Sequence, residues 1–357
     1  MKYRFAKILV KKVLPLLALF SIPRLLPAAA ITMSTSTALK ANRGIMMILS
    51  PAKTLDLNKF VGIPENALKL TYPSCDTEKT KLLAGILKSK SQKELKTLLK
   101  ISDKIATKVK EYFDEYKLDV HDRMECDSVK PAVFTFDGPA YKGIQASSCD
   151  ETTMHYMQSN LRIIDPFYGA LRPLDLIQPY RLEMATKAII QDLEVLETDK
   201  IKNLSSFWST SVTQNIIDEF SRMRKEEDKR ILVNLASDEY SAAIDLDMIK
   251  DSSCQFIKIS FQQEGRVISV HAKKARGLMV RYISENQLED QEDMKYFNLE
   301  GYAYIEERSD KNTYVFDRAK NYKDAEKERT SKRKTTNNIS KDGTAIGSIR
   351  TTKRRTR

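Results

Sequence analysis

Lysines recur at helical spacing in one short stretch of the sequence, between residues 91 and 108. Positions three and four apart share one face of a helix, so these side chains form a ridge on each of two consecutive helices. Ammonium groups presented in this way can bridge successive phosphates of DNA without reading its bases. Ordinary solvated helix faces carry the same pattern, and this is the alternative interpretation. The predicted DNA-binding residues are Lys93, Lys96, Lys100, Ser102, Lys104 and Lys108.

A lysine also follows the apolar run of residues 46–49, in the stretch SPAKT. A loop that cradles nucleotide phosphates needs glycines, so that successive N–H groups point inward. This stretch has no glycine, and Pro51 removes an N–H donor, which excludes a nucleoside-triphosphate loop. Lys53 is therefore predicted as a single cation at the carboxyl end of a strand, where α/β sheets bind ligands. The alternative is a surface lysine in a loop.

Further charged residues follow predicted strands and are expected to share a cleft with Lys53. Asp238 and Glu239 follow the predicted strand ILVNLA, 231–236, after a single serine, which makes them candidates for acid–base work or for holding a divalent cation. They equally suit the first turn of a helix, where acidic side chains complement the helix dipole. The predicted cleft residues are Lys53, Arg172, Tyr180, Arg181, Asp238, Glu239, Lys273, Lys274 and Arg276.

The histidines and cysteines do not suggest a metal site. His121, His155 and His271 share no helical or hairpin spacing with one another or with a cysteine, which disfavours zinc and non-haem iron. A site built only from carboxylates stays open. No cofactor is predicted, and no catalytic residue is assigned. The four cysteines are far apart, so reduced thiols are expected rather than a disulfide framework.

The positive charge of the chain is concentrated at its two ends. Residues 1–55 carry a net charge of +9 and residues 321–357 a net charge of +8, which leaves −5 of the total of +12 for the middle. A nucleic-acid surface in the middle must therefore be a local patch, because the overall balance there is mildly acidic.

Residues 1–45 have the composition of a targeting segment: a basic start, an apolar run and small residues, without any acid. A secretory signal with a transit-like segment, a mitochondrial presequence, and translation starting at Met46 or Met47 are the three interpretations. A membrane anchor is disfavoured, since Arg24 interrupts a run already shorter than the ~20 apolar residues of a span. The tail, 321–357, is predicted to be disordered. Its basic clusters suit phosphate binding, a nuclear-type address or a merely solvated tail.

The middle, residues 46–320, is predicted to be a single α/β domain with a mixed sheet flanked by helices. Strands are expected at 46–49, 132–136, 161–164, 231–235, 302–305 and 313–316, with a hairpin of 256–261 and 266–271. Residues 165–184 are expected to be irregular. A capping box at Ser91 and Glu94 begins one helix, and Ser102 or Asp103 begins the next, with Ile105 on its apolar face. Further helices are expected at 205–224 and 275–284.

Several blocks of the middle resemble, in the same order, the bacterial peroxide-stress-resistance family YaaA. The resemblance covers about residues 46–316 and excludes both ends. The blocks are MMILSPAKTLD, LLKISDKIA, YGALRPLDLIQPYRLEM, NLASDEY, HAKKARGLMVRYI and FNLEGYAY.

The resemblance implies a cytosolic protein that binds DNA through a basic cleft and a helix-hairpin-helix-like element and that helps to limit intracellular iron during peroxide stress. A non-enzymatic role is our leading interpretation. The turn at Lys100–Ser102 departs from the usual helix-hairpin-helix pattern, because it lacks glycines. Residues 1–45 make import into a plastid or mitochondrion the alternative to a cytosolic location. The alternative function is an enzyme acting on a nucleotide or nucleic acid, with Asp238 and Glu239 as acid–base groups or metal ligands. A third interpretation is an interaction protein that relies on its basic tail.

Overall fold

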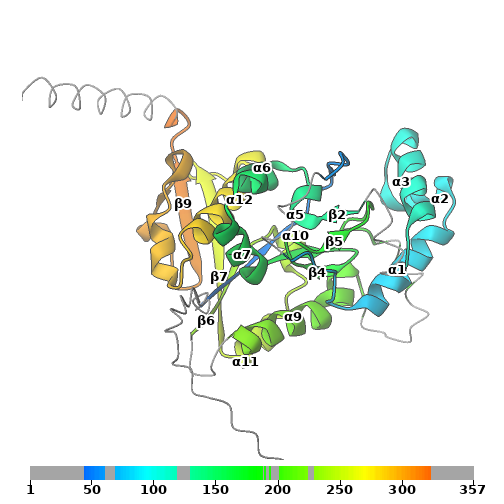
Figure 1. Cartoon of the computed structure of the whole chain (residues 1–357). Coiled ribbons are helices and arrows are strands. Elements are labelled where there is room, and N and C mark those ends of the chain that lie inside the picture. Colours follow the sequence, from blue (N-terminus) through cyan, green and yellow to red (C-terminus); the bar gives the residue numbers. More distant parts are fainter. Residues whose placement is uncertain are drawn as a thin grey trace, which may run out of the picture. The chain divides into compact units, whose positions relative to one another are not determined.

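A seven-stranded mixed sheet, in the order β4-β3-β1-β6-β7-β9-β8, forms the centre of the folded part (Figure 1). The computed structural model describes residues 44–60, 69–118, 129–187, 189, 193, 201–223 and 229–322. Neighbouring strands from β3 to β9 run parallel, whereas β4 and β8 pair antiparallel at the two edges. The strands of this sheet are β1 (Ile45–Leu49), β3 (Leu161–Asp165), β4 (Gly169–Leu171), β6 (Arg230–Leu235), β7 (Cys254–Gln263), β8 (Ala303–Tyr304) and β9 (Thr313–Arg318). A separate two-stranded ladder joins β2 (Lys130–Pro131) and β5 (Leu176–Ile177).

The strand β1 lies in the middle of the sheet and is apolar throughout. Its sequence IMMIL is buried at every position, because β3 and β6 flank it and helices cover both of its faces. Such continuous apolar runs are typical of parallel strands that are covered on both sides. The predicted strands at 46–49, 161–164 and 231–235 are therefore confirmed as β1, β3 and β6.

Helices lie on both faces of the sheet. The helices α6 (Pro139–Ile144), α7 (Glu151–Asn160) and α12 (Ser269–Glu285) pack on one face, whereas α9 (Leu204–Met223) and α11 (Leu246–Asp251) lie on the other (Figure 1). The chain leaves β1 along the first face towards β3, and it leaves β6 along the second face towards β7. The connections thus diverge between β1 and β6, which makes this place a topological switch point.

The helices α6 and α12 cross at two glycines. A Cβ atom at Gly143 would lie 2.4 Å from the carbonyl oxygen of Lys274, and one at Gly277 would lie 1.8 Å from that of Ala140. Both distances are far below van der Waals contact, so only glycine allows this approach. The crossing fixes α6, and with it Tyr141, beside the loop that follows β1.

A group of three helices lies beyond the β4 edge of the sheet: α1 (Thr77–Ser89), α2 (Gln92–Leu99) and α3 (Asp103–Glu115) (Figure 1). The capping box predicted for Ser91 and Glu94 is present, with both of its hydrogen bonds. The helix α3 packs on the turn between β3 and β4, where Phe167 contacts Phe113 and Tyr116. The remaining short helices are α5 (Ala132–Thr135), α10 (Asp238–Ser241), and the 3-10 turns η1 (Ala146–Ser148), η3 (Gln291–Tyr296), η4 (Leu299–Gly301) and η5 (Glu306–Arg308).

Some sequence-based predictions of local structure are wrong. Residues 132–136 form the short helix α5 rather than a strand; Pro131 precedes its first turn, and the hydroxyl of Thr135 donates to two carbonyl oxygens behind it. Residues 266–271 do not complete a hairpin, since α12 already begins at Ser269. Ile105 is 42 % exposed, and Ala106 takes its place against the core.

The segment expected to be irregular, 165–184, contains β4 and β5. The predicted helices at 205–224 and 275–284 are confirmed as α9 and α12, and β8 and β9 lie at the positions of the closing strands. The targeting segment and most of the basic tail lie outside the described residues.

Candidate functional site

The carboxyl ends of β1 and β6 meet in a pair of serines. Ser50 follows β1 and Ser237 precedes α10; the backbone N–H of Ser237 donates to the hydroxyl of Ser50 at 2.9 Å, and the two hydroxyl oxygens lie 3.4 Å apart. The hydroxyl of Tyr141 on α6 donates to the carbonyl oxygen of Ser50 at 3.1 Å. These bonds join three separate segments at the switch point, where α/β sheets bind their ligands.

Lys53 lies three residues after Ser50. It was predicted as a single cation, but its ammonium group forms an ion pair. Its ammonium group lies 2.5 Å from one carboxylate oxygen of Glu183, and Arg181 donates to the other oxygen at 3.0 Å. Arg181 also donates to the carbonyl oxygen of Lys53 at 3.0 Å. Two cations thus share one carboxylate, which leaves a local charge of about +1 to be balanced by solvent or by a ligand.

A buried carboxyl lies next to these ion pairs. Asp165 ends β3 with none of its surface exposed, accepts a hydrogen bond from the hydroxyl of Tyr180, and accepts two more at 2.8 Å from the backbone N–H groups of Phe167 and Tyr168. Burial raises the pKa of Asp165 to about 6, and these hydrogen bonds oppose the rise only in part. Burial, together with the Asp165 charge, also raises the pKa of Tyr180.

Tyr240 on α10 is the last member of the group of polar residues at this edge of the sheet. Its pKa is raised by burial, with further contributions from the negative charges of Glu239, Asp165 and Glu183, so its hydroxyl stays protonated and can only donate or accept a hydrogen bond at neutral pH. The edge cluster, as the term is used below, comprises Ser50, Lys53, Asp165, Tyr180, Arg181, Glu183, Ser237 and Tyr240.

Asp238 and Glu239 have different hydrogen-bond partners. The carboxylate of Asp238 accepts from Lys258 at 2.7 Å, and this hydrogen bond lowers its pKa. Glu239 accepts instead from the backbone N–H of Ala185 at 3.0 Å. Arg276 on α12 is close enough to Asp238 to interact with its charge, while burial lowers the pKa of its guanidinium.

The remaining predicted cleft residues lie apart from the edge cluster. Arg172 forms an ion pair at 2.9 Å with the buried Asp175 and donates to the carbonyl oxygen of Tyr72. Lys274 forms an ion pair with Glu300. Lys273 is exposed on α12 and forms no ion pair with any described residue. The structure thus brings Lys53, Tyr180 and Arg181 together, with Glu239 beside them, and separates the others into further pairs.

The predicted DNA-binding lysines lie on α2 and α3 and on the turn between them. Lys100 ends α2 in the left-handed conformation, with a φ of 52°, and Ser102 precedes α3 without capping it through its side chain. Lys96 forms an ion pair with Asp103 at 2.7 Å. Lys93, Lys100 and Lys104 are exposed, and none of them pairs with a carboxylate in the described part of the chain. The lysine ridge, as named below, comprises Lys93, Lys96, Lys100, Lys104 and Lys108.

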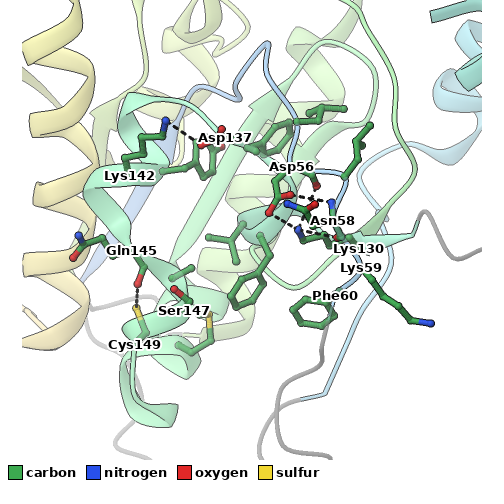
Figure 2. A pocket seen from close by; sticks show the side chains of 18 of the residues that line it. Asp56, Asn58, Lys59, Phe60, Lys130, Asp137, Lys142, Gln145, Ser147 and Cys149 are labelled. Atoms are coloured by element: carbon green, nitrogen blue, oxygen red, sulfur yellow. Dashed lines mark hydrogen bonds and ion pairs between the residues drawn. The ribbon is translucent and has the colours of Figure 1, made fainter. Parts of the chain in front are cut away.

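A cavity of about 1120 Å³ opens beside the loop that follows β1 (Figure 2). One wall is the segment from Leu55 to Phe60, and the other comes from α5, α6, η1 and the start of α7. The ring of Tyr141 lines this aromatic pocket, while its hydroxyl reaches the edge cluster. The side chains of Asp56 and Lys130 pair at 2.9 Å on one side, and those of Asp137 and Lys142 pair at 3.4 Å on the other.

Cys149 also lines the aromatic pocket, and it is a poor nucleophile. Burial raises the pKa of its thiol to about 11, although Arg281 donates to its sulfur at 3.1 Å. Among the described residues, no group of three or more His, Cys, Asp or Glu side chains could hold a metal ion. Within the same ranges, no helix is long and apolar enough to cross a membrane.

The predicted cleft residues do not include Asp165, Glu183 or the lining of the aromatic pocket, although Glu183 lies in the same charged stretch, QPYRLEM, as Tyr180 and Arg181. Asp165 follows a predicted strand directly, so the rule that selected Asp238 would also have selected it. Glu183 lies two residues after Arg181, but its partner Lys53 is 130 residues away, and no local pattern indicates that contact. The walls of the pocket include residues of α5, which was predicted as a strand, and of α6, for which no helix was predicted.

Comparison with known proteins assigns the family. The family described as peroxide stress protein YaaA matches residues 45–308. A UPF0246 protein of Francisella tularensis subsp. tularensis (strain WY96-3418) is 36 % identical over 278 residues, which is 77 % of this chain and the whole of that protein. UPF0246 proteins of Psychrobacter sp. (strain PRwf-1) and Marinomonas sp. (strain MWYL1) are 37 % and 39 % identical, over 76 % and 75 % of this chain and 97 % and 95 % of their own lengths. The chain is therefore a member of the YaaA family of peroxide stress proteins.

Proposed function

We propose that this peroxide stress protein binds DNA through the phosphate backbone, with the lysine ridge on α2 and α3 as its docking surface. The supporting observation is the exposure of Lys93, Lys100 and Lys104 without a carboxylate partner in the described part of the chain. An ammonium group without a carboxylate partner can neutralise a phosphate and release its counterion without first breaking an existing ion pair. Such binding is independent of sequence and weakens steeply with salt.

The geometry of the turn supports the same role. The left-handed conformation of Lys100 reverses the chain between α2 and α3 without a glycine. The side chain of Ser102 leaves the first N–H groups of α3 uncapped, so these donors and the positive end of the helix dipole lie beside the ammonium group of Lys104. A phosphate at this turn meets both kinds of donor. These features support our proposal that the turn acts as a helix-hairpin-helix-like element, although its sequence departs from the usual one.

The predicted cleft contributes less to this proposal than the ridge does. Lys53, Arg172, Arg181 and Lys274 each pair with a carboxylate, so a polyanion gains little net charge there. We therefore assign docking to the ridge, with Lys273 as an additional exposed cation on α12.

The test is a salt titration of duplex DNA binding by the full chain. Lys100→Glu/Lys104→Glu is expected to abolish most binding and to reduce the slope of log K against log[salt] by about 2, since each phosphate contact contributes about 0.9. The matched control is Lys311→Glu/Lys320→Glu, which changes the net charge equally at two exposed lysines outside the ridge. Equal losses in both variants would mean that binding follows the total charge or the basic tail rather than the ridge.

We extend the proposal to iron, following the resemblance: DNA-bound protein belongs to a response that limits intracellular iron during peroxide stress. Cells that lack the protein are expected to contain more chelatable iron after peroxide treatment. Complementation with the wild type restores the low level, and Lys100→Glu/Lys104→Glu fails to do so if DNA binding is required. Restoration by this variant would separate the iron effect from DNA.

A second candidate function is catalysis on a nucleotide or nucleic acid. The observation that favours it is the edge cluster at the switch point, where a buried carboxyl, tyrosine hydroxyls and ion-paired cations converge. Glu183 is the partly exposed carboxylate of this cluster, between Lys53 and Arg181. In contrast, Asp238 pairs with Lys258, and Glu239 accepts from the backbone of Ala185 outside the cluster. Turnover of nucleotides that disappears in Glu183→Gln, with DNA binding retained, would favour this function over simple binding.

A further inference from the structure

We propose that the aromatic pocket binds an uncharged, planar heteroaromatic small molecule such as a nucleoside. This goes beyond DNA binding, because the pocket lies outside the lysine ridge and none of its properties depends on a polyanion. At about 1120 Å³, the cavity is large enough for a ligand of nucleoside size, since small-molecule pockets have ~300–1,000 Å³.

The location of the pocket is the first argument. Its walls begin with the loop after β1 and include Tyr141, whose hydroxyl reaches the carbonyl oxygen of Ser50 at the switch point. Ligands of open α/β sheets bind beyond the carboxyl ends of the strands at such a point. The pocket is therefore joined to the edge cluster through Tyr141, although no residue of that cluster lines it.

The aromatic walls are the second argument. Phe60 and Phe134 lie 5.1 Å apart between ring centroids, and Phe136 and Tyr141 form a second pair at the same separation. Phe60 and Phe134 are only partly buried, although a folded chain gains by covering such rings. They therefore present faces on which a planar ring can stack, as bases do on aromatic side chains.

The charge of the pocket is the third argument, because it disfavours a phosphorylated ligand. Two of its lysines already pair with carboxylates: Lys130, which is also held by the carbonyl oxygens of Asp56 and Asn58, and Lys142. The acidic lining residues outnumber the lysines, so an added phosphate gains no net attraction. The lining acids and lysines are Asp56, Asp137, Asp150, Glu151, Lys59, Lys130 and Lys142.

Neutral polar groups remain for recognition. The side-chain amide of Asn58, which also hydrogen-bonds to Asp56, and the hydroxyl of Ser147 are exposed on opposite sides of the pocket (Figure 2), and that hydroxyl makes no hydrogen bond within the described ranges. An amide offers a donor and an acceptor side by side, which matches the edge of a heteroaromatic ring. The fixed Asp56–Lys130 pair holds the Asn58 loop in place, so less order has to be gained on binding.

The experiment uses the full chain and measures binding by calorimetry and ligand-observed NMR. The probes are adenosine, uridine and nicotinamide, with adenosine 5′-monophosphate as the charged comparison. Saturable binding of at least one uncharged probe is expected. Adenosine monophosphate is expected to bind several-fold more weakly than adenosine.

Variants assign the binding to the pocket. Phe134→Leu keeps the apolar volume but removes the stacking face, so affinity is expected to fall roughly tenfold. Asn58→Ala changes an exposed residue, leaves the fold intact and is expected to weaken binding several-fold. The control Tyr296→Leu removes a 73 % exposed aromatic ring outside the pocket and is expected to change nothing.

Three results would overturn the proposal: no saturable binding of any uncharged probe, tighter binding of the monophosphate, or unchanged affinity in both Phe134→Leu and Asn58→Ala. DNA binding measured on the same variants keeps the two proposals separate. Phe134→Leu is expected to bind DNA like the wild type, and Lys100→Glu/Lys104→Glu to bind adenosine like the wild type.

Discussion

The carbonyl oxygen of Ala140 occupies the place where a Cβ atom at Gly277 would have to lie, 1.8 Å from that atom. This single contact sets how closely α12 approaches α6. Since α6 carries Tyr141, the contact also sets the position of a pocket residue whose hydroxyl donates to Ser50 of the edge cluster.

Gly277→Val is expected to destabilise the protein strongly. The new side chain meets backbone atoms, which cannot rotate away, so the helices must separate at a cost of about 3 kcal/mol in the free energy of unfolding. The matched control is Gly85→Ala in α1, where an added Cβ has nothing within 4 Å. That change is expected to stabilise by about 0.5–1 kcal/mol, because alanine is the better helix former. Urea denaturation measures both.

The free energy of unfolding is expected to decrease as the pH rises from about 4 to about 6, because of Asp165. Its pKa is about 6 in the folded protein and near 3.8 in the unfolded chain, so the folded state keeps a proton that the unfolded state has already released. The loss amounts to on the order of 3 kcal/mol across that range. The amide in Asp165→Asn does not titrate in this range, so the difference in unfolding free energy between wild type and variant must change with pH. A constant difference would contradict the assignment.

The ion pair between Arg162 and Glu219 is expected to be far more important than its exposed neighbour. Arg162 is 2 % exposed, and its guanidinium lies 3.1 Å from the carboxylate of Glu219. Glu219→Ala leaves a buried cation without its counter-charge, which is expected to cost about 3 kcal/mol. The control is Arg222→Ala, which removes a 69 % exposed partner of the same carboxylate. This change is expected to cost less than about 1 kcal/mol in thermal or chemical unfolding.

Removal of the carboxylate at Asp103 is expected to strengthen DNA binding. Asp103 holds the ammonium group of Lys96 at 2.7 Å, so Asp103→Asn frees a lysine of the ridge for a phosphate. The slope of log K against log[salt] is expected to grow by about 1. Asp247→Asn is the control, because Asp247 is likewise an exposed acid in the first turn of a helix, α11. A similar gain in the control would indicate an effect of total charge alone.

Apolar runs and capping residues were sufficient to predict most of the parallel strands and long helices. The run at 231–235 became β6, and Ser91 begins α2, as expected. Short apolar stretches were ambiguous, because 132–136 satisfies a strand and a single helical turn equally well. Pro131 precedes that turn, and a proline at the start of a helix favours the helical alternative.

The chemistry of the candidate site was predicted less well than the fold. Lys53 and Arg181 were predicted as cleft cations, but the carboxylate that joins them, Glu183, is local to Arg181 and 130 residues away from Lys53. Ion pairing depends on contacts across the sheet, and residue types in one sequence do not reveal it. The ridge on α2 and α3 was easier to recognise, since its members are separated by only a few residues along the chain.

The central position of β1 in the sheet affects how the protein folds during synthesis. Met47 pairs with Leu161 on one side and with Val233 on the other, so the first strand to leave the ribosome must wait for partners that are synthesised much later. Its five apolar residues stay uncovered throughout that interval. A nascent chain of this protein is therefore expected to need shielding by a chaperone until β6 has emerged, and truncation before residue 235 should yield insoluble product.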